Sequence, residues 1–179
     1  VVAWQLDNEF GCHNTARAFS AHAEHAFQAW LAERYGSIEA LNRAWGTAFW
    51  SQEYRSFSQV LLPRDTPDAL DGEGQHPSLA LDFARFSSDV QVRFAREQAA
   101  IVRAASPGRL ITHNLMGSGP IEVDYHALAA ELDVVGFDWY PHFATRGRAI
   151  AVGGLDHDLM RGAKQRSIWM LEQTAGAGG

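Results

Sequence analysis

The chain has 179 residues, of which 46% are hydrophobic and 11% aromatic, a composition typical of a globular domain rather than a disordered segment. Its net charge of -6, its scattered arginines and the lack of an apolar stretch of about 20 residues argue against a nucleic-acid partner and a membrane partner. Cys12 is the only cysteine, which excludes an internal disulfide and favours a reducing, cytoplasmic location.

The first predicted element is a strand at residues 1–6, a continuous apolar run of the kind that strands covered on both faces show. Asn14 is the expected N-cap of a helix over residues 15–35, and a shorter helix is predicted at residues 38–45. Residues 50–77 lack periodicity and are rich in proline, aspartate, glycine and serine, so we predict a long functional loop or insertion there.

The rest of the chain alternates helices with short apolar runs. We predict a helix at 79–105, a strand at 109–115, a helix at 125–132, a strand at 133–138, a helix at 150–164 and a strand at 167–171. The long helix carries an apolar stripe, which we expect to be its buried face, formed by Phe83, Phe86, Val90, Phe94 and Ile101.

This alternation predicts an α/β fold whose parallel strands are joined by right-handed crossovers. An open doubly wound sheet and part of a (β/α)8 barrel both fit, but no glycine-rich phosphate loop follows any predicted strand. Polar residues gather at the C-terminal ends of all four predicted strands, where barrel active sites lie. They are Asp7, Asn8, Glu9, His113, Asn114, Asp138, Trp139, Tyr140, Glu172 and Gln173. We therefore predict a partial TIM barrel with a long insertion after its first strand.

Both ends of the chain fall next to apolar runs. Residue 1 opens a predicted strand without a methionine, and residues 175–179 form a glycine and alanine tail just after the last predicted strand. Natural termini usually lie in exposed segments. We therefore interpret residues 1–179 as one partial catalytic barrel domain that is cut at both ends, so that a signal peptide cannot be assessed.

Two strand-end carboxylates, Glu9 and Glu172, have the residue type and placement that hydrolysis of a glycosidic bond requires. A retaining glycosidase holds two carboxyl groups about 5–5.5 Å apart, one as nucleophile and one as acid and then base. If the first and last strands belong to one parallel barrel, both side chains face the same mouth. On residue types alone, however, two charges that merely end strands remain an equal alternative.

Four sequence motifs in order resemble family 42 of the glycoside hydrolases, the β-galactosidases of a large clan of retaining barrel enzymes. They are WQLDNEFG at 4–11, LNRAWGTAFWS at 41–51, THNLMG at 112–117 and WMLEQ at 169–173. The resemblance covers the whole chain. In this clan an Asn-Glu pair ends the fourth barrel strand and the nucleophile ends the seventh, so the chain is expected to cover about strands 4 to 7.

The resemblance implies that Glu9 is the acid/base and Glu172 the nucleophile of a β-galactosidase that works by double displacement. It also implies substrate contacts. Asn8 is expected to bind the sugar 2-hydroxyl, Trp50 to line the galactose pocket, and Tyr140 to hydrogen-bond the nucleophile. Asn114 is expected either to contact substrate or to support the floor of the pocket.

No metal and no cofactor are expected. Several family members bind a structural zinc through cysteines, but this chain has Ala18, Ser20 and Ala23 at the corresponding positions, and Cys12 is alone. Family members commonly form trimers, so a homotrimer is the assembly that the resemblance implies.

Two alternatives stay open. The chain could belong to a non-catalytic galactoside-binding protein, or to a related β-glycosidase with a different sugar specificity. Taken by itself, the 179-residue chain is expected to be inactive, because a barrel owes its stability to closure.

Overall fold

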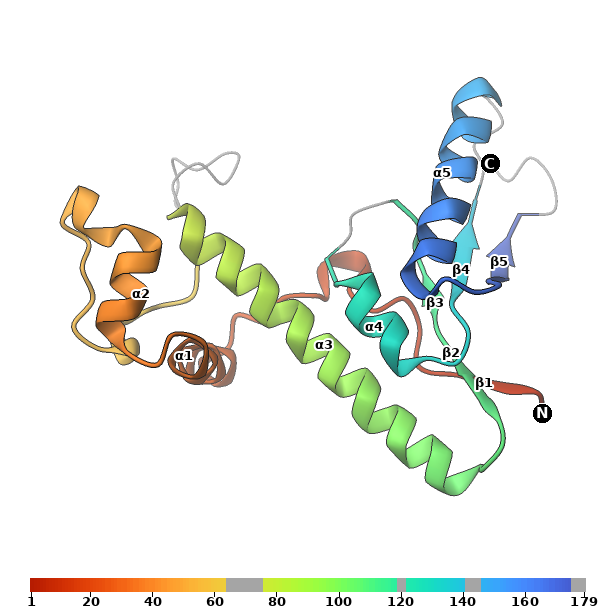
Figure 1. Cartoon of the computed structure of the whole chain (residues 1–179), viewed down its shortest axis with the longest axis horizontal. Coiled ribbons are helices and arrows are strands. Elements are labelled where there is room, and N and C mark those ends of the chain that lie inside the picture. Colours follow the sequence, from red (N-terminus) through yellow and green to blue (C-terminus); the bar gives the residue numbers. More distant parts are fainter. Residues whose placement is uncertain (64–75, 119–121, 141–145, 175–179) are drawn as a thin grey trace. The chain divides into compact units, whose positions relative to one another are not determined.

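The computed structural model describes residues 1–63, 76–118, 122–140 and 146–174 (Figure 1). It divides into two compact units, which are described separately below. The sheet unit comprises Val1–Ala16 and Ser88–Gly179, and the helical unit comprises Arg17–Ser87. The prediction of a single domain over residues 1–179 stays a prediction.

The described strands are all parallel, as the alternation of helices and strands predicted. They are β1 (Ala3–Gln5), β2 (Leu110–Thr112), β3 (Asn114–Leu115), β4 (Gly136–Trp139) and β5 (Trp169–Gln173). In Figure 1, β1 lies beside β2, and β3, β4 and β5 follow side by side. The order of strands in space is therefore their order in the chain, which is what successive βα units of a barrel give.

The predicted strand at 109–115 is interrupted at His113, so that it forms the two segments β2 and β3. Its first segment pairs with β1, with Trp4 opposite Ile111, and its second segment pairs with β4. The backbone oxygen of His113 still accepts a hydrogen bond from the nitrogen of Gly136 at 3.1 Å. The interruption thus leaves the chain in line with its neighbours.

Helices α3 (Pro77–Ala105), α4 (Tyr125–Glu131) and α5 (Arg146–Lys164) lie close to their predicted positions. Asp124 caps α4 by accepting hydrogen bonds from the nitrogens of His126 and Ala127.

The predicted apolar stripe of α3 is wrong in the C-terminal half of the helix. Phe94 is 45% exposed and Ile101 is 68% exposed, whereas Val92, Ala95 and Ala99 are buried. Val92 and Ala95 join the core around Leu115 and Phe137, and Ala99 packs with Ile111. Small side chains face the core here, and the larger ones lie at the border.

The predicted start of the first helix is also wrong. Helix α1 spans Ala21–Tyr35 and is capped by Ser20, whose hydroxyl accepts a hydrogen bond from the nitrogen of Ala23 at 3.1 Å. Asn14 instead ends a short 3-10 turn, Cys12–Asn14. An N-cap is predicted at a polar residue that precedes a helical run. Both Asn14 and Ser20 fit that pattern, so the sequence does not distinguish them.

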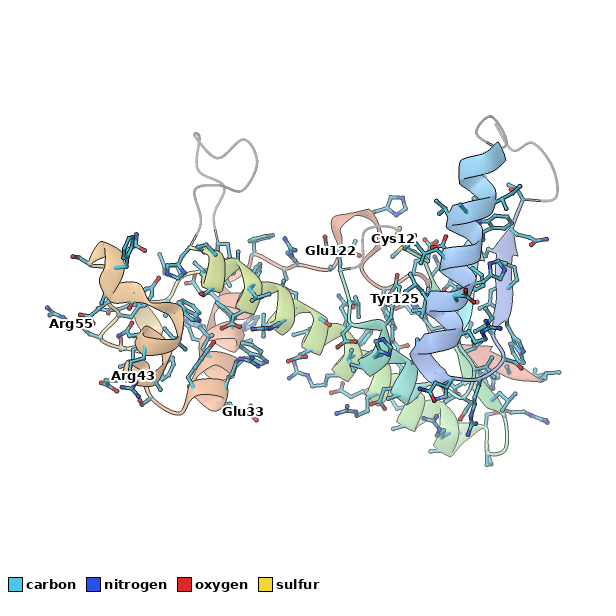
Figure 2. The ribbon with its side chains drawn as sticks, turned by 45° about the horizontal axis from the view of Figure 1, so that its top comes forward. Cys12, Glu33, Arg43, Arg55, Glu122 and Tyr125 are labelled. Atoms are coloured by element: carbon cyan, nitrogen blue, oxygen red, sulfur yellow. The ribbon has the colours of Figure 1, made fainter. Side chains whose placement is uncertain are left out.

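The helical unit also contains α2 (Ile38–Trp45), as predicted, and 3-10 turns at Thr47–Trp50 and Phe57–Gln59. The second turn lies in the predicted loop at 50–77, of which residues 64–75 fall outside the described part of the chain. Figure 2 shows Glu33, Arg43 and Arg55 projecting from this unit, and all three are exposed.

A buried carboxylate organises the interior of the helical unit. Asp82 accepts hydrogen bonds from the hydroxyl of Tyr35 at 2.5 Å, the indole nitrogen of Trp45 at 2.9 Å and the guanidinium of Arg85 at 3.0 Å. Three charged or polar donors satisfy the charge that burial would otherwise penalise.

None of the helices in the described ranges combines the length and the apolar character that a bilayer crossing requires.

Candidate active site

The parallel strands bring polar side chains together at their C-terminal ends. Glu9 follows β1, Asn114 begins β3, Asp138 lies in β4, Tyr140 follows β4, and Glu172 lies in β5. Glu9, Asp138 and Glu172 each place one carboxylate oxygen within 4.8 Å of the other two. All of these residues belong to the sheet unit. The topology thus brings together the two carboxylates that the sequence singled out, and it adds a third.

The loop that carries Glu9 has a strained backbone. Asp7 has a φ of 46° and Glu9 a φ of 42°, in the left-handed region that residues other than glycine adopt at a cost of about 1–2 kcal/mol each. Surrounding hydrogen bonds must therefore hold the loop in place. The backbone nitrogen of Glu9 donates to the side-chain oxygen of Asn114 at 3.1 Å.

His113 clamps the same loop on both sides of Glu9. Its Nδ1 lies 2.5 Å from the carbonyl oxygen of Leu6, and its Nε2 lies 3.1 Å from the backbone nitrogen of Phe10. The carbonyl can only accept, so Nδ1 donates and Nε2 accepts, which is the pattern of a neutral imidazole. Burial lowers the pKa of His113, against opposing effects of the Leu6 hydrogen bond and of Asp7 and Glu9, and this favours the same neutral form.

Replacing His113 with phenylalanine should destabilise the sheet unit. The ring would keep its place against Phe10, which stacks on His113 at 4.2 Å, but two buried backbone groups would lose their partners. We expect the free energy of unfolding to fall by about 2–4 kcal/mol in a denaturant titration. His126→Phe, at an exposed position of α4, is the matched control and should change it little.

The contribution of His113 to the free energy of unfolding should depend on pH. Because folding lowers the pKa of His113, its contribution to stability is complete above the unfolded value of about 6.5 and is lost as pH falls below it. His113→Phe should lack this loss. An equal acid sensitivity in both proteins would contradict the neutral clamp.

Asn114 is the centre of the hydrogen-bond network. It is fully buried, and its side-chain oxygen accepts from Gln5 at 3.0 Å as well as from the backbone of Glu9. Its amide nitrogen lies 2.7 Å from Asp138 Oδ2, 3.0 Å from Asn8 Oδ1 and 3.1 Å from Glu172 Oε1. This one side chain therefore links the strand ends that carry all three carboxylates.

Glu172 is held by both of its oxygens. Oε1 accepts from Asn114, and Oε2 accepts a short hydrogen bond from the hydroxyl of Tyr140. The bond to Glu172, followed by burial and the charges of Glu172, Asp138 and Glu9, raises the pKa of Tyr140 to about 12. Tyr140 therefore remains a protonated donor at neutral pH.

Asp138 is the most deeply buried of the three carboxylates, at 7% exposed. Burial, together with the charges of Glu172 and Glu9, raises its pKa to about 7 against the opposing hydrogen bond from Asn114. Its Oδ1 is buried and has no hydrogen-bond partner among the described residues.

A cavity of about 440 Å³ opens beside these groups. Its lining combines carboxylates with aromatic and apolar side chains: Glu9, Met116, Ser118, Asp138, Trp139, Tyr140, Val152 and Asp156. Asp156 reaches it from α5, where Oδ1 accepts from the backbone nitrogen of Ser118 at 2.6 Å. Polar groups beside aromatic faces suit a sugar ring, which has hydroxyls at its edge and apolar C–H faces.

Among the described residues, two sets of side chains are close enough to share a cation. They are Glu9 with Cys12 and His13, and Glu9 with Asp138 and Glu172. Neither offers the four nitrogen or sulfur ligands of a structural zinc. Both also use Glu9, and we assign a metal to neither set. The expectation of no metal and no cofactor stays a prediction.

The structure unites five of the predicted site residues: Asn8, Glu9, Asn114, Tyr140 and Glu172. The side chain of Trp50 lies outside the described part of the molecule, so its contact with galactose stays a prediction.

No role was predicted for Asp138 or His113, although both are among the strand-end polar residues. A charged or imidazole side chain inside an apolar strand was the available signal, because such groups are rarely buried without partners.

Comparisons with known proteins identify the family. The family model described as "Beta-galactosidase", that of glycoside hydrolase family 42, matches residues 1–179. The chain is 41% identical over 189 residues to β-galactosidase Bga of Halorubrum lacusprofundi, covering 98% of this chain and 26% of that protein. It is 42% identical over 191 residues to a β-galactosidase of Thermus thermophilus, covering 98% and 28%. The chain therefore spans about a quarter of the length of these curated relatives.

Solved structures agree. The β-galactosidase from Halorubrum lacusprofundi superimposes with a TM-score of 0.87 at 41% identity, over 97% of this chain and 27% of that one. The β-galactosidase from the psychrophilic Marinomonas ef1 gives 0.87 at 38% identity, over 98% and 28%. These matches confirm the predicted α/β fold class, a partial (β/α)8 barrel. The chain belongs to glycoside hydrolase family 42, as its four sequence motifs predicted.

Proposed function

We propose that the protein carrying this chain is a retaining β-galactosidase, which releases terminal β-D-galactosyl residues by double displacement. The carboxylates of Glu9 and Glu172 carry the proposal, because they approach within 4.8 Å at the C-terminal ends of β1 and β5. This close approach supports a retaining mechanism, because an inverting one needs the two carboxyl groups about 6.5–9.5 Å apart to leave room for a water.

Glu172 is the proposed nucleophile. Hydrogen bonds from Asn114 and Tyr140 fix both of its oxygens, so the carboxylate is oriented before substrate arrives. Attack on the anomeric carbon forms a galactosyl ester with Glu172, and the bond to the leaving oxygen breaks.

Glu9 is the proposed acid and base. Its side chain is half-buried and lines the cavity, and its backbone is held by Asn114. It gives a proton to the leaving oxygen in the first step. It then takes a proton from the water that hydrolyses the galactosyl ester.

The substrate contacts follow from the same network. Asn8 is exposed, and its side-chain oxygen accepts a hydrogen bond from Asn114. The amide N–H groups of Asn8 are therefore the proposed donors to the sugar 2-hydroxyl. Tyr140 lines the cavity, and Trp50 is the proposed aromatic wall of the galactose pocket. Asn114 is fully buried, which favours a supporting role over direct contact with substrate.

The remaining properties are proposals of the same kind. We propose a cytoplasmic homotrimer that acts on β-galactosides, needs no cofactor and has neither a nucleic-acid nor a membrane partner. The acidic net charge of -6 supports the absence of a nucleic-acid partner.

Hydrolysis of nitrophenyl glycosides tests the proposal. The purified full-length protein should cleave the β-galactoside faster than the β-glucoside or the α-arabinoside, and NMR should show β-galactose as the first product. An α-anomer as first product would contradict the retaining mechanism. Preference for the glucoside would favour a related β-glycosidase, and galactose binding without turnover would favour a non-catalytic binding protein.

A further inference from the structure

The third carboxylate of the site, Asp138, is not used by the two-carboxylate mechanism. It lies in β4, between the strands that position Glu9 and Glu172, and one of its oxygens lies within 4.8 Å of an oxygen of each. Asn114 holds Oδ2 at 2.7 Å, whereas Oδ1 is buried without a hydrogen-bond partner among the described residues. A buried acceptor of this kind is costly unless a proton or a donor reaches it.

We propose that Asp138 is a positioning residue that shares one proton with Glu9 and so keeps the acid form of the site populated at neutral pH. This inference rests on the proposed acid role of Glu9. Asp138 itself touches no reacting atom in the mechanism.

Electrostatics favours a shared proton. Three carboxylates this close cannot all be ionised without strong repulsion, so the site retains a proton where isolated carboxyls have lost theirs. Burial, with the charges of Glu172 and Glu9, raises the pKa of Asp138 to about 7. Contact with the Glu9 carboxyl is among the causes that raise this pKa, and the two groups have oxygens within 4.8 Å of each other, so Glu9 is the proposed second holder of the proton.

In this proposal Glu172 is ionised, and Asp138 and Glu9 share the proton. Glu172 has Asn114 and Tyr140 as donors, which suit an ionised carboxylate. When the shared proton is on Glu9, the ionised Asp138 holds it there. When Glu9 passes that proton to the leaving oxygen, Glu172 has become a neutral ester, so the total charge of the three carboxyls stays at two negative units.

Other titratable groups face Asp138 from the surrounding elements. Tyr140, which follows β4, stays protonated, and Asp156 from α5 lines the same cavity. His157 from α5 contacts the ring of Trp139, the residue next to Asp138, at 5.9 Å between ring centroids. His157 is therefore the neighbouring group whose replacement serves as the control.

The test is the pH profile of kcat/KM for lactose in the full-length protein. Asp138→Asn keeps the size of the side chain but removes the carboxyl that shares the proton. The basic limb of the profile should move to lower pH by about one unit. With each profile scaled to its own plateau, the variant should then be about tenfold less active than the wild type at pH 8. His157→Gln should leave the basic limb in place. A uniform loss at every pH in Asp138→Asn would mean a purely structural role and would overturn the proposal.

A second measurement covers an Asp138→Asn protein that does not fold. Infrared spectra of the wild-type protein with 13C-labelled aspartate should show one protonated aspartic acid that titrates near pH 7. Glu9→Gln should move that titration to lower pH. No such aspartate, or one that ignores Glu9→Gln, would refute proton sharing. If the proposed function is wrong, the wild-type protein will lack galactosidase activity. The infrared test of proton sharing does not depend on that activity.

Discussion

Glu172→Ala should reduce hydrolysis of β-galactosides by about 10⁵-fold or more, because loss of a nucleophile removes the route through the covalent intermediate. Added azide should restore turnover of an activated galactoside by entering the space that the carboxylate vacates. The product should be the α-galactosyl azide, since attack from that face inverts the anomeric carbon. Product analysis by NMR gives the configuration directly.

Glu97→Ala is the matched control for Glu172→Ala. It removes the same side chain from an exposed position of α3 in the same unit, far from the strand ends in sequence. Its activity and melting temperature should match those of the wild type. Substantial activity in a Glu172→Ala preparation free of wild-type protein would show that another group is the nucleophile.

Glu9→Ala should separate substrates by leaving group. For lactose, whose leaving sugar needs a proton, kcat/KM should fall by about 10²–10⁴-fold, the usual contribution of a general acid. For dinitrophenyl galactoside, whose phenolate leaves unaided, kcat/KM should change by less than about tenfold. An equal loss on both substrates would indicate that Glu9 positions substrate rather than donating a proton.

Azide distinguishes the two carboxylates by stereochemistry. In Glu9→Ala the galactosyl ester on Glu172 still forms, so azide should attack that ester and give the β-galactosyl azide. The two variants should therefore give opposite anomers with one reagent. The same anomer from both would contradict the assignment of roles.

The sheet was predictable because each buried parallel strand is a continuous apolar run that ends in polar residues. Residues 1–6 and 167–171 show that pattern, and parallel pairing places their C-terminal ends at one edge. The approach of Glu9 and Glu172 follows from this topology alone. Their chemical roles came from the resemblance, because a carboxylate at a strand end does not reveal whether it donates a proton or attacks carbon.

Features that depend on side-chain contacts across the fold could not be predicted. The strand is interrupted at His113, whose ring bonds Leu6 and Phe10, more than a hundred residues away in the chain. The buried face of α3 uses Ala95 and Ala99, since close packing against the sheet favours small residues over the larger apolar ones nearby. A stripe predicted from the spacing of large apolar residues does not reveal this preference for alanine.

Asp138 could not be assigned from the sequence for a related reason. Its importance lies in its proximity to two carboxylates that are 129 positions before it and 34 positions after it in the chain. Only the spatial order of β1, β3, β4 and β5 brings the three together.

If Glu9 is the acid and base proposed above, its left-handed backbone sets selection for stability against selection for catalysis. At a φ of 42°, glycine would relieve about 1–2 kcal/mol of strain, but it would remove the carboxyl group. A gene copy released from selection for hydrolysis would therefore gain stability by losing this glutamate. Glutamate at such a position is therefore expected to persist only where its carboxyl group is used.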